Sequence, residues 1–260
     1  MVIRERYLKQ IRPFYDQDLI KVLIGIRRSG KSVILNQIID ELREKGIDDK
    51  HIIYINFEDF DYDEYTDPKK LNDYVKGKII DSKKYYLFFD EIQNVDKWEK
   101  VINSFRATQN TSIFITGSNS DLLSSDLATH IAGRYVSFRI TPFTFKEACE
   151  LLNISDRQGQ ENEFSDYIKW GGLPQRFMQT DDESRKIYLK DVYDSIVIKD
   201  IIKRFNIKDI DLLNRIVTYI LTTPSQTFSP ENLKRYFESE SRNVSLETLY
   251  NYLDALCKAL

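Results

Sequence analysis

The chain has 260 residues, 42% of them hydrophobic and 30% charged, which is the composition of a globular protein and excludes a disordered or collagen-like one. Its 38 basic and 41 acidic side chains leave a net charge of −3, so no global basic field calls for nucleic acid or an anionic membrane. No apolar run approaches the roughly 20 residues that cross a bilayer, and two distant cysteines, Cys149 and Cys257, form no disulfide framework. We therefore expect a protein of the reducing cytoplasm with no membrane association.

Short apolar runs alternate with helical patterns in the first half of the chain, which is typical of an α/β fold. The strand candidates are residues 19–24, 51–57, 85–89, 112–116 and 134–140. The helix candidates are residues 31–45, 67–80, 96–107 and 120–131. The strand candidate 85–89 reads YYLFF and is apolar throughout, as expected where both faces of a sheet are covered.

Strand patterns stop after about residue 143, and helical patterns fill the rest of the chain. They cover residues 145–152, 164–169, 184–204, 209–221, 230–238 and 245–260. The last pattern places its leucines on one stripe and reaches the chain end without a Gly or Pro stop. We expect from this that the sequence ends before its last domain is complete; an exposed terminal helix is the alternative.

The segment GIRRSGKS, residues 25–32, matches the pattern G-x-x-x-x-G-K-[ST] and lies between a predicted strand and a predicted helix. Its glycines allow the backbone to curl so that N–H groups point at phosphate oxygens, and the helix N-terminus adds a positive dipole end. We expect Lys31 to bind the β- and γ-phosphates and the Ser32 hydroxyl to complete a Mg²⁺ shell. The predicted nucleotide-binding residues here are Gly25, Ile26, Arg27, Arg28, Ser29, Gly30, Lys31 and Ser32. The alternative is an ordinary strand–turn–helix connection in which both arginines are solvated.

Two acidic residues, Asp90 and Glu91, directly follow the YYLFF strand candidate. A carboxylate at the end of a buried strand, beside a phosphate loop, can hold Mg²⁺ through water, and we assign this role to Asp90. Glu91 then lies where it can take a proton from the attacking water. A solvated pair that opens a loop is the alternative. With the phosphate loop present, the pair favours ATP hydrolysis over phosphoryl transfer to a small acceptor.

These motifs, together with FITGSNS, the Gly133-Arg134 pair and YIKWGGLP, resemble one family, the bacterial and archaeal AAA-type P-loop ATPases with an uncharacterised C-terminal domain, near the STAND group. The resemblance extends from about Ile3 to the chain end. It implies a P-loop NTPase sheet in the strand order 5-1-4-3-2, followed by a helical lid and a winged-helix-like domain. The domains expected are 1–143 for the ATPase core, 144–206 for the lid and 207–260 for the winged-helix-like part, which looks truncated.

The resemblance also implies roles for four residues outside the phosphate loop and the acidic pair. Ser118 or Asn119 stands at the sensor position that reaches the γ-phosphate, although both residues also suit the N-cap of the next helix. Arg134 corresponds to an arginine finger that completes a neighbouring subunit's site, with a surface arginine as the alternative. Pro174 corresponds to the lid proline that packs on adenine, with a helix C-cap and turn as the alternative.

The charge of the C-terminal helices decides which partner we expect. Basic and acidic side chains balance over residues 200–260. Because phosphate neutralisation dominates affinity for DNA, we expect this part to contact protein rather than DNA.

We therefore predict an Mg²⁺-dependent ATPase for which slow turnover and a homo-oligomer are both open; the sequence does not give the oligomeric state. Lys31, Glu91 and Arg134 are its predicted catalytic residues, and its nucleotide state would pass to the helical C-terminal domain. Two alternatives stay open: a nucleotide-gated switch or scaffold with negligible turnover, and a DNA-binding regulator.

Overall fold

The computed structural model describes residues 2–118, 131, 133–195, 201–223 and 228–259. The chain divides into two compact units, Met1–Thr180 and Asp181–Leu260. The three-domain division at residues 143 and 206 stays a prediction. The helix predicted over residues 120–131 lies almost wholly outside the described residues.

The first unit is built on a five-stranded parallel sheet in the order β2-β3-β4-β1-β5. Read from the other edge, this is the predicted order 5-1-4-3-2, so the expected P-loop NTPase sheet is confirmed. Its strands are β1 (Ile20–Gly25), β2 (Ile52–Asn56), β3 (Tyr85–Asp90), β4 (Thr111–Ser118) and β5 (Tyr135–Arg139). Because all of the strands are parallel, the residues that follow them gather at one edge of the sheet.

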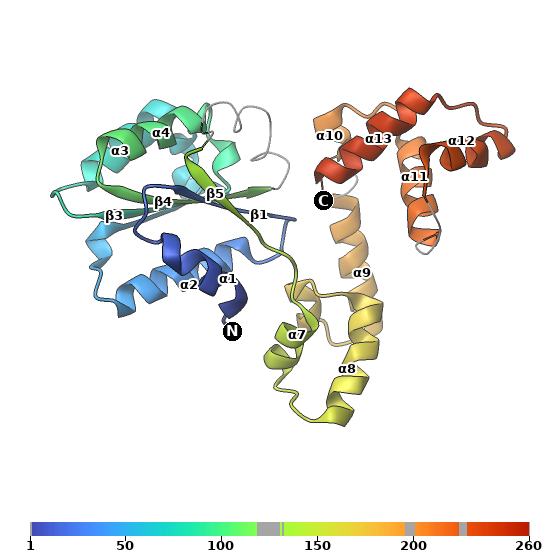
Figure 1. The fold of residues 1–260 in the computed structure, drawn as a ribbon, viewed down its shortest axis with the longest axis horizontal. Coiled ribbons are helices and arrows are strands. Elements are labelled where there is room, and N and C mark those ends of the chain that lie inside the picture. Colours follow the sequence, from blue (N-terminus) through green and yellow to red (C-terminus); the bar gives the residue numbers. More distant parts are fainter. Residues whose placement is uncertain (1, 119–130, 132, 196–200, 224–227, 260) are drawn as a thin grey trace. The chain divides into compact units, whose positions relative to one another are not determined.

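Helices cover both faces of this sheet (Figure 1). Helices α1 (Glu5–Ile11) and α2 (Lys31–Glu44) lie on one face, and α3 (Pro68–Lys78) and α4 (Trp98–Thr108) lie on the other. Short 3₁₀ turns connect these elements: η1 (Arg12–Phe14), η2 (Asp49–His51), η3 (Phe60–Thr66) and η4 (Ile92–Asn94). Helix α1 is not among the predicted helices, although its buried Tyr7, Leu8 and Ile11 follow helical spacing.

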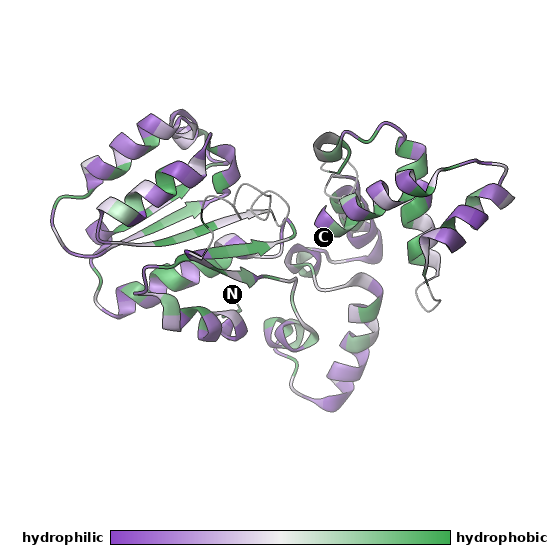
Figure 2. Cartoon of the chain, turned by 45° about the horizontal axis from the view of Figure 1, so that its top comes forward, coloured by the Kyte–Doolittle hydropathy of each residue, from purple (hydrophilic) through white to green (hydrophobic). Residues whose placement is uncertain are grey.

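The two faces of the sheet bury separate apolar clusters, because successive side chains of a strand point to opposite sides. In β1, Val22 and Ile24 join the cluster under α3 and α4, while Leu23 joins the cluster under α1 and α2. Figure 2 shows hydrophobic strands flanked by helices that carry a hydrophilic outer face. Every residue of β1 and β3 is buried, as predicted for YYLFF.

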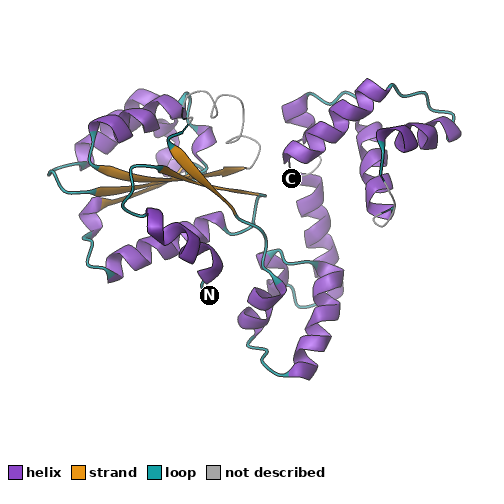
Figure 3. Cartoon of the chain, in the orientation of Figure 1, coloured by secondary structure: helices purple, strands orange, loops and turns teal. Residues whose placement is uncertain are grey.

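After β5 the first unit continues in helices alone (Figure 3). These are α7 (Phe145–Leu152), α8 (Arg157–Trp170) and the 3₁₀ turn η5 (Pro174–Met178). Helix α7 begins at a capping box, in which the Thr144 hydroxyl accepts the Glu147 N–H and the Glu147 carboxylate accepts the Thr144 N–H. This capping box fixes where the helical segment leaves the sheet.

The second unit is helical around its own apolar core. It contains α9 (Asp182–Val192), α10 (Ile201–Phe205), α11 (Ile210–Thr222), α12 (Pro230–Ser239) and α13 (Leu246–Ala259). The helix predicted over residues 184–204 corresponds to α9 and α10, and residues 196–200 between them lie outside the described residues. The winged-helix-like character of this unit stays a prediction. Nowhere in the described part of the chain does a helix have the length and apolarity needed to cross a membrane.

Candidate functional site

The phosphate loop connects β1 to α2 at the carboxyl edge of the sheet, and two glycines shape it. Gly25 has a φ of +153°, and a Cβ there would lie 2.1 Å from the carbonyl oxygen of Ile140. That close approach follows from pairing, since the Ile140 N–H donates to the Ile24 carbonyl at 2.7 Å. Gly30 has a φ of +96° and is the N-cap of α2. Both positions therefore require glycine, as the motif predicts.

Lys31, the first residue of α2, places a buried ammonium at the loop. Its side chain is 4% exposed, and Nζ donates to the carbonyls of Gly25 at 3.2 Å and Ile26 at 3.3 Å. Nζ also lies 3.7 Å from Oε1 of Glu91. Burial lowers the pKa of Lys31 below its usual value, while the carboxylates of Glu91 and Asp90 act in the opposite direction. A buried cation in such a setting is suited to an anionic ligand.

Asp90, the last residue of β3, is buried and held by two hydroxyl groups. The Thr116 hydroxyl donates to Oδ1, and the Tyr54 hydroxyl donates to Oδ2 at 3.0 Å. Burial and the nearby Asp90 carboxylate raise the pKa of Tyr54, so this phenol stays a donor. Thr116 and Tyr54 are not among the predicted site residues; they come from β4 and β2, the two strands that flank β3.

Glu91 adopts a left-handed conformation with a φ of +54°. Its N–H donates to the Thr116 hydroxyl at 3.0 Å, and its Oε2 accepts a hydrogen bond from the Gln93 amide at 2.6 Å. The turn that follows β3 therefore fixes both the backbone and the carboxylate of this residue. Gln93 was not predicted, although its place in DEIQN is a local signal for a partner of Glu91.

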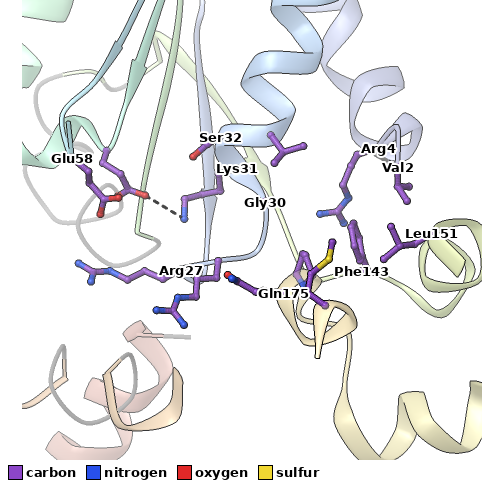
Figure 4. Close-up of a pocket in the computed structure, with 15 residues that line it drawn as sticks. Val2, Arg4, Arg27, Gly30, Lys31, Ser32, Glu58, Phe143, Leu151 and Gln175 are labelled. Carbon is purple, nitrogen blue, oxygen red and sulfur yellow. Dashed lines mark ion pairs between the residues drawn. The ribbon is translucent and has the colours of Figure 1, made fainter. Parts of the chain in front are cut away.

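A cavity of about 900 Å³ opens beside the phosphate loop, within the first unit (Figure 4). It is lined by Val2, Arg4, Arg27, Arg28, Gly30, Lys31, Ser32, Val33, Glu58, Glu91, Phe143, Leu151, Pro174, Gln175 and Met178. One part is charged: Lys31 lies 3.7 Å from Glu91, and the unpredicted Glu58 lies on the same side of the cavity as Lys31 (Figure 4). Phe143, Leu151 and other apolar side chains line a second part. A cavity of this size with a few convergent polar groups suits a small-molecule ligand.

Pro174 lines the cavity, and the GGLP segment that carries it is tied to the connection that follows β5. The Phe143 N–H donates to the Gly172 carbonyl at 2.8 Å. A Cβ at Gly172 would lie 2.0 Å from the Phe143 carbonyl oxygen, so glycine permits this contact. Pro174 then begins η5 at a position that proline favours.

Three other predicted residues either do not line the cavity or lie wholly or partly outside the described part of the chain. Only the backbone of Ser118 is described, at the end of β4, and Asn119 lies outside the described residues. Arg134 directly precedes β5, at the amino ends of the strands and therefore opposite to the phosphate loop. Its carbonyl accepts the Ile20 N–H at 2.9 Å. Its guanidinium donates to Asn103 at 3.2 Å. Arg134 therefore does not join the site of its own chain, and its role toward a neighbouring subunit stays a prediction.

The residues at the loop fit the magnesium ion that the motif implies. Ser32 lines the cavity and Asp90 ends the strand behind it, and both offer the oxygen ligands that Mg²⁺ prefers. Across the described ranges, no group of three or more His, Cys, Asp and Glu side chains could hold a metal ion. A magnesium ion here would therefore depend on the Ser32 hydroxyl, on the Asp90 carboxylate through water, and on phosphate oxygens, and few protein ligands are usual for this ion.

Two known families match successive parts of the chain. Residues 17–149 match the AAA domain family, and residues 161–260 match a domain of unknown function. An uncharacterized protein of Haemophilus influenzae is 39% identical over 98% of the chain, and one of Methanocaldococcus jannaschii is 34% identical over 90%. The chain spans only 64% and 54% of the lengths of these two relatives.

Among solved structures, the Walker-type ATPase of Pyrococcus abyssi is similar in fold, with a TM-score of 0.59. It is 16% identical, and the match covers 100% of this chain and 90% of that one. Such a likeness concerns the fold, whereas the family match covers the phosphate loop, Asp90 and Glu91 directly. The chain belongs to the AAA domain family and has the fold of the P-loop ATPases.

Proposed function

We propose that the chain binds ATP with Mg²⁺ at the phosphate loop and hydrolyses it. The observation that carries the proposal is the position of Lys31, a buried ammonium that lines the cavity 3.7 Å from the carboxylate of Glu91. The Lys31 ammonium would hold the γ-phosphate, and the Glu91 carboxylate would accept a proton from water. Their proximity supports the proposal that both tasks act at one phosphorus atom.

The phosphate loop would bind the triphosphate through its N–H groups, the dipole of α2 and the ammonium of Lys31. Ser32 and Asp90 would hold the Mg²⁺, which would neutralise phosphate charge when bound. Arg27 and Arg28 also line the cavity, and their positive charges favour the same ligand.

Glu91 would act as the general base. It would take a proton from a water molecule as the water oxygen attacks the γ-phosphorus, and the bond from that phosphorus to the β-phosphate oxygen would break to release ADP. Gln93 would hold the carboxylate in place through its hydrogen bond to Oε2. A fixed base avoids part of the cost of reorganisation during the reaction.

The apolar part of the cavity would hold the base of the nucleotide. Phe143, Leu151 and Pro174 line it, and Pro174 belongs to the predicted lid. No N-K-x-D pattern for guanine is apparent in the sequence, so adenine is the proposed base. Closure around the base would pass the nucleotide state to the C-terminal helices, which we propose contact a protein partner.

The test compares ATP binding and phosphate release in the wild type with those in Lys31→Ala. Loss of a charged partner for the phosphates should weaken ATP binding about a hundredfold. Lys21→Met is the matched control, because Lys21 is also buried in this unit but lies near the start of β1, at the other end of the strand. Unchanged ATP affinity in Lys31→Ala would refute the proposal. Binding without turnover in the wild type would favour a nucleotide-gated switch instead.

A further inference from the structure

The side chain of Arg4 is buried between the phosphate loop and helix α7. It is 1% exposed, although it precedes the first helix of the chain. Gln37 of α2 fixes the segment that carries it: its side-chain oxygen accepts the Arg4 N–H at 3.0 Å, and its amide donates to the Val2 carbonyl at 2.7 Å. The guanidinium is thereby held in a defined place beside the cavity, which Arg4 also lines.

The planar guanidinium contacts three parts of the chain at once. Nη1 donates to the Ser29 carbonyl of the phosphate loop at 2.9 Å. Nε and Nη2 donate to the two carboxylate oxygens of Glu147 at 2.8 and 3.1 Å. Nη2 also donates to the Thr141 carbonyl at 3.0 Å, in the connection between β5 and α7. The fork geometry of arginine allows these contacts together, which a single ammonium does not.

The contact at Ser29 bears on phosphate binding through the planarity of the peptide bond. In a trans peptide the carbonyl and the following N–H point in opposite directions. The hydrogen bond from Arg4 fixes the Ser29 carbonyl so that it points toward the guanidinium. The Gly30 N–H, in the same peptide unit, must then point away from the guanidinium. Gly30 is the N-cap of α2 and lines the cavity. Arg4 thus orients one of the loop N–H groups.

The contact at Glu147 bears on helix α7. The carboxylate that pairs with Arg4 is also the capping-box acceptor for the Thr144 N–H, at 2.8 Å. Burial alone would raise the pKa of Glu147, but the hydrogen bonds from Arg4 and Thr144 outweigh it and hold this pKa below its usual value. Glu147 therefore stays ionised, and the start of α7 depends on the place of the guanidinium.

We propose that Arg4 is a positioning residue that couples the phosphate loop to the start of helix α7, so that nucleotide at the loop stabilises α7. This inference rests on the proposed nucleotide binding. Coupling between two sites is reciprocal, so disruption of α7 must weaken nucleotide binding by the same factor by which nucleotide stabilises α7. Couplings of this kind typically change affinity roughly 5- to 150-fold.

The test measures ATP affinity together with hydrogen exchange of the α7 amides, with and without ATP, in the wild type and in Arg4→Lys. Lysine keeps the charge but cannot make the fork of contacts. We expect ATP to slow exchange in α7 of the wild type. In Arg4→Lys we expect that ATP-dependent difference to shrink at the first turn of α7, where Glu147 lies, and ATP affinity to fall at least fivefold. A merely structural role would change exchange equally with and without ATP.

The matched control is Arg176→Lys. Arg176 is likewise buried and pairs with Glu163 at 2.9 Å, but its described hydrogen bonds stay within the helical segment after β5. The Arg176→Lys variant should be less stable than the wild type, but ATP should still slow hydrogen exchange in its α7. Glu147→Gln removes the carboxylate that pairs with Arg4. If Arg4→Lys does not fold, we expect the same changes in hydrogen exchange and ATP affinity from Glu147→Gln.

Two results would overturn the inference while leaving the proposed function intact. One is ATP binding by the wild type with no change of exchange in α7. The other is an ATP-dependent difference in Arg4→Lys or Glu147→Gln that equals that of the wild type. Failure of the wild type to bind ATP at all would instead refute the proposed function, and with it this inference.

Discussion

The ammonium of Lys31 and the carboxylate of Glu91 lie 3.7 Å apart, although the two residues are separated by two strands and two helices along the chain. Lys31 begins the helix after β1, and Glu91 follows β3. Both β1 and β3 pair with β4, so the carboxyl ends of these parallel strands reach one edge of the sheet. The strand order thus brings together Lys31 and Glu91, the proposed phosphate-binding cation and the proposed proton acceptor.

Replacement of Glu91 by glutamine should separate binding from turnover. The amide keeps the size of the side chain but cannot accept the proton of the attacking water, so we expect kcat to fall roughly 10²- to 10⁴-fold. ATP affinity should stay within a few-fold of the wild type, because Lys31 and the loop N–H groups are unchanged. Phosphate release and equilibrium ATP binding measure the two effects. Wild-type turnover in this variant would remove Glu91 from the mechanism.

The parts of this site that the sequence predicts are those encoded locally. The phosphate loop and the Asp-Glu pair each occupy one short segment. The conformation of the glycines, the start of α2 and the end of β3 depend mainly on residues close by in sequence. The sheet order followed from the resemblance to a known family. The bounds of most helices and strands agree to within a few residues, because apolar periodicity reports burial directly.

The parts that were missed depend on contacts distant in sequence. Arg4 meets Glu147 across 143 residues and Ser29 across 25, and no pattern near Arg4 indicates either partner. Tyr54 reaches Asp90 only because β2 and β3 pair in register. An exposed acidic residue such as Glu58 looks in sequence like any solvated side chain, and the cavity alone distinguishes it.

Alanine at position 25 should destabilise the first unit strongly. The new Cβ would lie 2.1 Å from the backbone oxygen of Ile140, and the φ of +153° disfavours any L-residue. Backbone strain and overpacking together should lower the free energy of unfolding by roughly 3 kcal/mol or more. Urea denaturation followed by circular dichroism measures this quantity.

Gly46→Ala is the control for this prediction. Gly46 also has a positive φ, +84°, but a Cβ there would meet no atom within 4 Å. Its substitution should cost only the strain of the left-handed conformation, about 1–2 kcal/mol. Equal losses in the two variants would contradict a steric role for Gly25.

Arg134 should act on a neighbouring subunit if it acts in catalysis at all. It lies at the amino ends of the strands, opposite to the phosphate loop, and it is exposed. An arginine finger typically contributes roughly 10³ or more to kcat. We therefore expect Arg134→Ala to bind ATP normally and to hydrolyse it very slowly.

Mixing two inactive variants distinguishes this role from a structural one. Lys31→Ala keeps Arg134 but lacks a working site, while Arg134→Ala keeps the site but lacks the guanidinium. A mixture should recover phosphate release, because one variant completes the site of the other. Asn103→Ala, which removes the described partner of Arg134, should keep activity. A mixture as inactive as its components would argue against action between subunits.

The buried Lys21 should make stability depend on pH. Its side chain is fully buried, and Nζ donates to the Ser112 hydroxyl at 2.7 Å and to the Gln17 carbonyl at 3.1 Å. Burial, helped by the nearby Lys84, lowers the pKa of Lys21 from 10.5 to about 7. Between these values the unfolded chain binds the proton and the folded chain does not.

The free energy of unfolding therefore rises with pH in this window, because the unfolded state binds more protons. Loss of one proton on folding gives a slope of up to about 1.4 kcal/mol per pH unit near pH 8–9. Urea denaturation at several pH values measures the slope. We expect Lys21→Met to remove it, and Lys50→Met, a change at a half-exposed lysine, to preserve it. If the slope persists in Lys21→Met, another group carries the pH dependence and the folded state tolerates a charged Lys21.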